Sequence, residues 1–158
     1  MAVVRLESWT PPLPDVEEVA RPILADAANP AVRAVEIDFD ARRSERAWYG
    51  ALLERLRRGL GASKPLGITA LASWCLGDPW VRTLAVSDAV PMLFRMGVGE
   101  AYHPGEDFRP GVCRSSVGVS TDEPLPEFPR GRRVYIFHPR SWSVVELRAA
   151  VHEVQRWE

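Results

Sequence analysis

The most informative part of this chain is residues 34–60, AVEIDFDARRSERAWYGALLERLRRGL. Apolar and acidic side chains alternate through 34–40, which predicts a half-buried β-strand. Apolar residues then recur at helical spacing, at Trp48, Leu52, Leu56 and Leu60. Ser44 is in place to cap this helix, and Gly59 and Gly61 are expected to end it. The stretch therefore predicts a strand followed directly by an amphipathic helix.

Five more segments rich in Val, Ile and Phe predict strands, at 3–7, 67–74, 92–96, 115–121 and 133–138. Helical patterns lie between several of them, which indicates β-α-β units and a parallel sheet. A last helix is expected to begin at Ser143, because Glu146 follows at capping-box spacing. Four residues at helical spacing form its predicted buried stripe: Val144, Leu147, Val151 and Val154.

Six parallel strands are two fewer than the eight that close a TIM barrel, a (β/α) fold of about 250 residues. The predicted fold is therefore α/β, a partial (β/α) TIM barrel with the equivalents of strands three to eight. Residues 1–158 are expected to form a single domain that corresponds to the C-terminal part of such a barrel. An open doubly wound sheet is the alternative, but no glycine-rich phosphate turn follows the first strand. A barrel without two of its strands exposes sheet edges, and self-association through these edges is expected.

Charge and hydropathy argue against several classes of partner. Lys plus Arg, 20 residues, nearly balance Asp plus Glu, 21 residues, so no nucleic acid partner is expected. No apolar run reaches the roughly 20 residues of a membrane helix, and no secretory signal is recognisable. The sequence as written predicts a cytoplasmic protein that does not bind membranes. An envelope or secreted location is the expectation if a front segment with a signal is missing.

The cysteines and histidines predict no metal site. Cys75 and Cys113 have no metal-ligand spacing, and the three histidines are scattered along the chain. The two cysteines are expected to be free thiols, and no cofactor is expected.

Acidic side chains share one face of the strand at 34–40. Since side chains alternate along a strand, Glu36, Asp38 and Asp40 lie on the same side, with Asp40 nearest the C-terminal rim where barrel enzymes keep their sites. Carboxylates this close raise at least one pKa, as a general acid requires. We therefore predict Asp40 as the catalytic acid or base and Asp38 as the group that tunes it. The alternative is a structural network in which Arg95 neutralises Glu36 and Asp38.

Other polar residues are expected to converge on the same rim. Glycoside hydrolysis needs a second carboxylate, which Asp122, Glu123 or Glu7 could supply from the ends of other strands. Of these, Asp122 or Glu123 is the predicted second catalytic carboxylate. Trp74, together with Trp80, is predicted to form a platform on which a sugar stacks. The predicted substrate-binding residues are Glu36, Trp74, Arg95, Ser120 and Glu7. The long segment with His103, Pro104, Gly105 and Pro110 is expected to be a functional loop.

Four stretches resemble an uncharacterised bacterial family, a domain of unknown function. They are VEIDFDAR at 35–42, GITALASW at 67–74, PMLFRMG at 91–97 and SVGVSTDEP at 116–124. The resemblance implies a barrel with glycoside-hydrolase-like character, but no activity.

More distantly, the acidic strand resembles that of chitinase-type glycoside hydrolases, which carry Asp-x-Asp-x-Glu with the glutamate as proton donor. Asp38 and Asp40 match the two aspartates, with Arg42 in the donor's place. A shift by two residues places Glu36, Asp38 and Asp40 on the motif, with Asp40 as the donor. The resemblance implies a barrel that acts on or binds a carbohydrate. The alternatives are a non-catalytic domain that binds a glycan or a protein, and an inactive truncated barrel.

Overall fold

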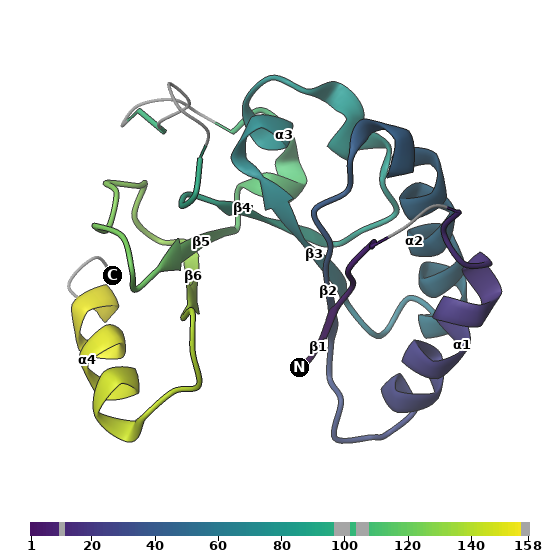
Figure 1. Cartoon of the computed structure of the whole chain (residues 1–158), viewed down its shortest axis with the longest axis horizontal. Coiled ribbons are helices and arrows are strands. Elements are labelled where there is room, and N and C mark those ends of the chain that lie inside the picture. Colours follow the sequence, from purple (N-terminus) through teal and green to yellow (C-terminus); the bar gives the residue numbers. More distant parts are fainter. Residues whose placement is uncertain (10–11, 97–101, 104–107, 156–158) are drawn as a thin grey trace.

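Six parallel strands form one sheet in the computed structural model, which describes residues 1–9, 12–96, 102–103 and 108–155. The strands pair in chain order. They are β1 (Ala2–Arg5), β2 (Val35–Asp38), β3 (Leu66–Leu71), β4 (Asp88–Met92), β5 (Ser116–Ser120) and β6 (Arg133–Phe137). Figure 1 shows the sheet curled like part of a barrel wall, with the helices on its outside. The predicted partial α/β barrel is confirmed.

Four α-helices flank this sheet: α1 (Val16–Ala27), α2 (Arg46–Leu60), α3 (Ala72–Leu76) and α4 (Val144–Gln155). Three short 3-10 helices, η1 (Arg43–Glu45), η2 (Pro79–Thr83) and η3 (Gly111–Cys113), lie in the connections. The predicted cap at Ser44 is wrong, because this residue lies inside η1, which precedes α2. Glu45 stabilises the start of this turn instead, because its Oε2 accepts a hydrogen bond from the Arg42 backbone N–H at 2.7 Å.

The core lies between the outer face of the sheet and the helices. Val35 and Ile37 of β2 are 1% and 0% exposed, and they pack in one cluster with the apolar side of α2. Tyr49 of α2 is fully buried and meets the Phe39 ring edge-on, with ring centroids 5.1 Å apart. The predicted alternation in this strand is therefore confirmed. Its consequence is that the acids of β2 lie on the opposite, inner face of the sheet.

Two predicted strands have boundaries that are wrong by three residues or more, whereas the others differ by one or two. The strand expected at 67–74 ends at Leu71, where the chain turns directly into α3. The strand expected at 92–96 is β4, which runs from Asp88 to Met92. Pro91, which has no N–H for a ladder hydrogen bond, obscures this strand in the sequence. Residues 93–96 are a loop in which Arg95 has the left-handed φ of 51°.

Cys75 and Cys113 form a disulfide, so the prediction of free thiols is wrong. Cys75 lies in α3 and Cys113 in η3, with Cα atoms 5.9 Å apart across a sequence separation of 38 residues. The Arg109 backbone N–H also donates to the Cys75 carbonyl at 3.1 Å. The fold brings the two cysteines together, and their spacing along the sequence gave no sign of it. Of the loop predicted to be functional, residues 97–101 and 104–107 lie outside the described residues.

The predicted buried stripe of α4 is mostly wrong. Val154 is buried, but Val144, Leu147 and Val151 are 66%, 45% and 40% exposed. Ala150 is the other residue of α4 that is buried. In a β/α barrel the helix after a strand also covers the next strand of the barrel, and the sheet ends at β6. The apolar face of α4 therefore lacks the strand on which it would pack.

Candidate functional site

The inner face of the sheet carries charged and hydroxyl side chains among apolar ones. Register places Arg5 of β1 beside Asp38 of β2, and Glu36 beside Gly67 of β3. Alternate residues of the later strands continue this face. The polar ones are Thr69, Asp88, Ser116, Ser120, Arg133 and Tyr135, and the apolar ones include Leu71, Val90, Met92 and Phe137. The Ser116 hydroxyl, for example, donates a hydrogen bond to Asp88 at 2.6 Å. Charged and hydroxyl groups thus line the surface that would be the interior of a closed barrel.

Asp38 is held in place by two neighbouring strands. Its Oδ1 accepts a hydrogen bond from the Thr69 hydroxyl at 2.8 Å, and its Oδ2 lies 3.5 Å from Nη1 of Arg5. The same guanidinium donates through Nε to Glu7 at 2.9 Å. These two contacts fix the orientation of the carboxylate. The arginine that neutralises the acidic strand is therefore Arg5, and the predicted pairing of Arg95 with Glu36 and Asp38 is wrong.

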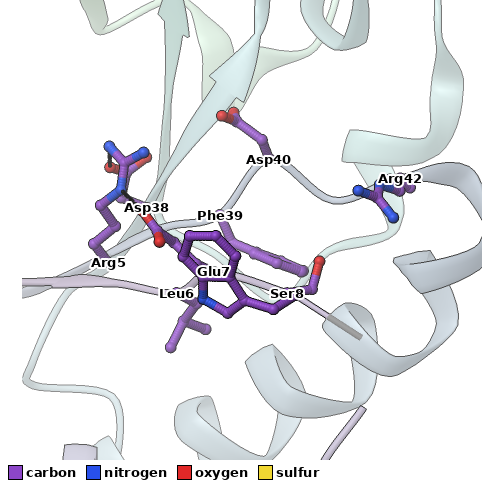
Figure 2. Close-up of a pocket in the computed structure, with 9 residues that line it drawn as sticks. Arg5, Leu6, Glu7, Ser8, Asp38, Phe39, Asp40 and Arg42 are labelled. Carbon is purple, nitrogen blue, oxygen red and sulfur yellow. Dashed lines mark hydrogen bonds and ion pairs between the residues drawn. The ribbon is translucent and has the colours of Figure 1, made fainter. Parts of the chain in front are cut away.

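Asp40 lies just beyond β2, at the C-terminal rim of the sheet. Partial burial of its carboxyl group raises its pKa, the charge of Asp38 raises it further, and Arg5 opposes this shift. Figure 2 shows Asp38 and Asp40 in one pocket, with Arg5 on one side of it and Arg42 on the other. A carboxyl group with a raised pKa next to a fixed carboxylate is the arrangement of a proton donor.

Two cavities meet at these acids. One, of about 300 Å³, is lined by residues that include Arg5, Glu7, Trp9, Asp38 and Asp40. The other, of about 360 Å³, lies over the inner face and is lined by Arg5, Asp38, Asp40, Leu71, Met92, Phe94, Arg95, Ser120, Phe137, His138 and Pro139. We call Arg5, Asp38 and Asp40, which line both cavities, the rim site. Cavities of this size accept small ligands.

Glu36 lies one inward-facing position before Asp38 and is 4% exposed. Burial raises its pKa to about 8, and the charges of Asp88 and Asp38 add to this effect. Its Oε1 is buried without a hydrogen-bond partner among the described residues. Its other oxygen lies so close over Gly67 that a Cβ there would be 2.1 Å away. Glu36 therefore lies in a deeper layer of the inner face and lines neither cavity of the rim site.

Asp122 and Glu123 hold the loop that follows β4. Asp122 pairs with the Arg95 guanidinium at 3.1 Å, and the Ser120 hydroxyl also donates to it. These two contacts, the Ser120 hydrogen bond first, lower the pKa of Asp122. Glu123 accepts a hydrogen bond from the Arg95 backbone N–H at 2.9 Å. Neither acid lines a cavity with Asp40, whereas Glu7 does.

Trp74 does not form the predicted sugar platform. Its side chain is 3% exposed and meets the Trp80 ring edge-on, with centroids 4.7 Å apart. The Arg46 guanidinium lies over the Trp80 ring at 4.5 Å, which completes this cluster. The tryptophan that lines a cavity of the rim site is Trp9, which is 83% exposed. Its place shortly after the first strand is the signal that could have identified it, because parallel strands end at one rim.

Comparisons of the chain with protein-family models, with curated proteins and with solved structures found no significant match. No group of three or more His, Cys, Asp or Glu side chains in the described part of the chain is arranged to hold a metal ion. None of the described helices is both long and apolar enough to cross a membrane. What the rim site can do therefore follows from its own geometry.

Proposed function

We propose that the chain supplies the proton donor of a carbohydrate-binding active site, in a barrel that acts as a glycoside hydrolase. Asp40 would be the proton donor, and Asp38 would hold its pKa high. The observation that carries this proposal is the pair itself: a carboxylate fixed by Thr69 and Arg5, next to a carboxyl group with a raised pKa, where two cavities meet. Enzymes that cleave glycosidic bonds use this kind of unequal carboxyl pair.

In the proposed reaction Asp40 gives its proton to the glycosidic oxygen as the bond from that oxygen to the sugar carbon breaks. Glu7 is the candidate for the second carboxylate, because it is the one of the three predicted partners that lines a cavity together with Asp40. Glu7 would take a proton from the water that attacks the sugar carbon, while Asp40 is left as a carboxylate. Exchange of protons with solvent restores both groups. Arg5 contacts Glu7 and also acts electrostatically on Asp40, so the two carboxyl groups share one neighbouring cation.

The lining of the cavities supports a sugar as the ligand. Carboxylates, a guanidinium and the Ser120 hydroxyl provide partners for the hydroxyl groups of a sugar. Apolar side chains stand among them: Trp9 in one cavity and Leu71, Met92, Phe94 and Phe137 in the other. A sugar ring offers hydroxyl groups at its edge and C–H groups on its faces, so both kinds of lining have a counterpart.

A second candidate is a non-catalytic domain of the same fold that binds a glycan or a protein, or an inactive barrel. The observation that favours it is that the other acids near the rim already pair with arginines. Asp122 and Glu123 are bound by Arg95, and Glu7 is bound by Arg5. Binding without hydrolysis would then be the activity of the rim site.

The disulfide also supports a proposal about location. Disulfides persist in oxidising compartments and are rare in the cytoplasm. The Cys75–Cys113 bond therefore favours the envelope or secreted alternative over a cytoplasmic location.

Replacement of Asp40 tests the proposed reaction. Asp40→Asn keeps the size of the side chain but removes the proton that is donated, so hydrolysis is expected to fall by about 10²-fold or more, whereas ligand binding remains. The measurement is hydrolysis of a panel of 4-nitrophenyl glycosides, with calorimetric binding of soluble oligosaccharides. Asp26→Asn, on the exposed face of α1, is the matched control.

Each outcome of this experiment decides between the candidates. Full activity in Asp40→Asn would exclude Asp40 as the acid. Oligosaccharide binding by the unchanged chain without hydrolysis would support the non-catalytic domain. Neither binding nor hydrolysis across the panel would contradict both carbohydrate proposals.

The pH profile tests the role of Asp38. A proton donor must be protonated, so activity is expected to fall as pH rises through the raised pKa of Asp40. The charge of Asp38 contributes to that raised pKa. Asp38→Asn removes the charge and should move the alkaline limb of the profile to lower pH, as measured by kcat/KM against pH. An unchanged limb would show that Asp38 does not tune Asp40.

A further inference from the structure

The inner face of the sheet has an excess of acids. Its inward-facing positions, together with those that continue β1 and β2 by two residues, carry five carboxyl groups: Glu7, Glu36, Asp38, Asp40 and Asp88. Two guanidinium groups on the same face, Arg5 and Arg133, oppose them. A barrel interior is normally filled and neutralised by residues from all of its strands. At neutral pH Glu36 is protonated, because its pKa is about 8, and the four other acids outnumber Arg5 and Arg133. The described strands therefore leave negative charge on this face that they do not balance.

Glu36 shows where a partner is needed. It is 4% exposed, so solvent hardly reaches its carboxyl group, and its Oε1 lacks a hydrogen-bond donor among the described residues. A buried polar atom without a partner costs free energy. A donor on the inner face would remove this cost.

The two end strands turn toward a common interior. The Tyr135 hydroxyl of β6 lies 3.9 Å from the sulfur of Met1, which immediately precedes β1. Arg5 of β1 and Phe137 of β6 line the same cavity. In the sheet order, however, β1 and β6 are at opposite ends and do not pair with each other. We call the stretch between their unpaired outer edges the open side (Figure 1).

The apolar face of α4 borders this open side. Exposed apolar residues follow one another from the end of β6 into α4: Trp142, Val144, Val145, Leu147 and Val151. The chain as a whole exposes 9535 Å², against about 7,900 Å² for a compact monomer of this mass. The excess, about 1,600 Å², is similar in size to the area that one partner loses in a large permanent interface.

We propose that the open side is a docking surface for a polypeptide segment of two parallel β/α units, different in sequence from this chain. Its two strands would pair with the outer edges of β6 and β1 and bring the sheet to eight strands. Its inward side chains would be basic or hydrogen-bond donors, with one of them at Glu36. An apolar outer face of its first strand would pack under Leu147 and Val151.

A second copy of the chain fits this surface poorly. Two copies that met through their open sides would bring together two inner faces with the same excess of acids, and like charges in an enclosed interior repel. A basic segment has no such repulsion. The proposal does not depend on the proposed hydrolase reaction.

The first test is made on the chain alone. It is expected to be a monomer by light scattering after gel filtration, with fast hydrogen exchange at the amides of β1 and β6 and slow exchange in β3. A stable dimer in which these edges are protected would overturn the proposal in favour of a second copy. Slow exchange at both edges of a monomer would show that they are not open, and would also overturn it.

The second test adds a probe. It is a designed βαβα segment of about 60 residues, the length of two barrel units. One version carries Lys at the inward position that faces Glu36, and the matched version carries Glu there. The Lys version is expected to bind the chain and slow exchange at β1 and β6 by about tenfold or more, and to bind about tenfold more tightly than the Glu version. Failure of both versions to bind would overturn the proposal.

Variants of the chain show whether binding uses the named surface. Glu36→Gln is expected to reduce the preference for the Lys version over the Glu version. Leu147→Gln, on the apolar face of α4, should weaken binding about tenfold, whereas Arg148→Gln beside it should not. Equal effects of the two α4 variants, or an unchanged preference in Glu36→Gln, would mean that the segment binds elsewhere and would overturn the proposal.

Discussion

Glu36 makes the stability of the chain depend on pH. Its pKa is about 8 in the folded chain, against 4.5 as the ordinary value, because burial and the nearby Asp88 and Asp38 disfavour its charged form. The unfolded chain therefore loses this proton at lower pH than the folded chain does. The contribution of Glu36 to stability is fully present below about pH 4.5 and is lost as pH rises through 8.

Glu36→Gln is expected to reverse this loss. The amide has the shape of the protonated carboxyl group but does not ionise, so the free energy of unfolding should rise at pH 8, by an amount on the order of a few kcal/mol. Little change is expected at pH 4. Urea denaturation across this pH range measures the effect, and Glu18→Gln on α1 is an exposed control. The same gain at pH 4 as at pH 8 would contradict the role of ionisation.

The acids of the rim site could be predicted from the sequence, but their partners could not. The alternation through 35–40 predicted that Asp38 and Asp40 share a face, since a strand has a fixed period of two. The partners of Asp38 are Arg5 and Thr69, on the two neighbouring strands. Their contact depends on register between strands, which no single strand encodes. For the same reason, the sequence indicated Arg95 as the partner of Asp38, whereas Arg5 is the arginine that pairs with it.

Ser143 and Glu146 form the predicted capping box of α4. The Ser143 hydroxyl accepts from the Glu146 N–H at 3.2 Å, and Oε2 of Glu146 accepts from the Ser143 N–H at 3.0 Å. Ser143→Ala should lower the free energy of unfolding by about 1 kcal/mol, and Ser143→Gly by only a few tenths. Urea midpoints measure both, with Ser141→Ala as the control in the preceding loop. An effect of Ser141→Ala as large as that of Ser143→Ala would show that the cap is not responsible.

Local signals of this kind explain which elements the sequence predicted well. The cap and period of α4 lie within a few residues of each other, so the helix was found where it is. Which of its faces is buried depends on the strands beneath it, and the predicted stripe at Leu147 and Val151 is exposed because the sheet ends at β6. The position of β4 was missed because Pro91, a residue typical of strand edges and turns, lies within that strand.

At the scale of the whole molecule, the count and parallel order of the strands followed from the alternation of strand and helix patterns. The contact between α3 and η3 did not follow from these patterns. There the chain is held by the Cys75–Cys113 bond, which joins α3 to η3 over 38 residues. Proximity of this kind arises only after the strands have paired, so a sequence with two isolated cysteines does not predict it.

Loss of this disulfide should therefore destabilise the chain as a whole. A crosslink that closes a loop of this length restricts the unfolded chain, and its loss is expected to cost about 3 to 4 kcal/mol. The Cys75→Ala/Cys113→Ala double variant should show this loss in urea denaturation, and dithiothreitol should destabilise the unchanged chain but not the double variant. A thiol assay on the unfolded chain should detect no free cysteine before reduction. Two free thiols, together with equal stability of the chain and the double variant, would mean that the bond does not form. The contact between α3 and the chain around η3 would then depend on other interactions, such as the hydrogen bond from the Arg109 N–H to the Cys75 carbonyl.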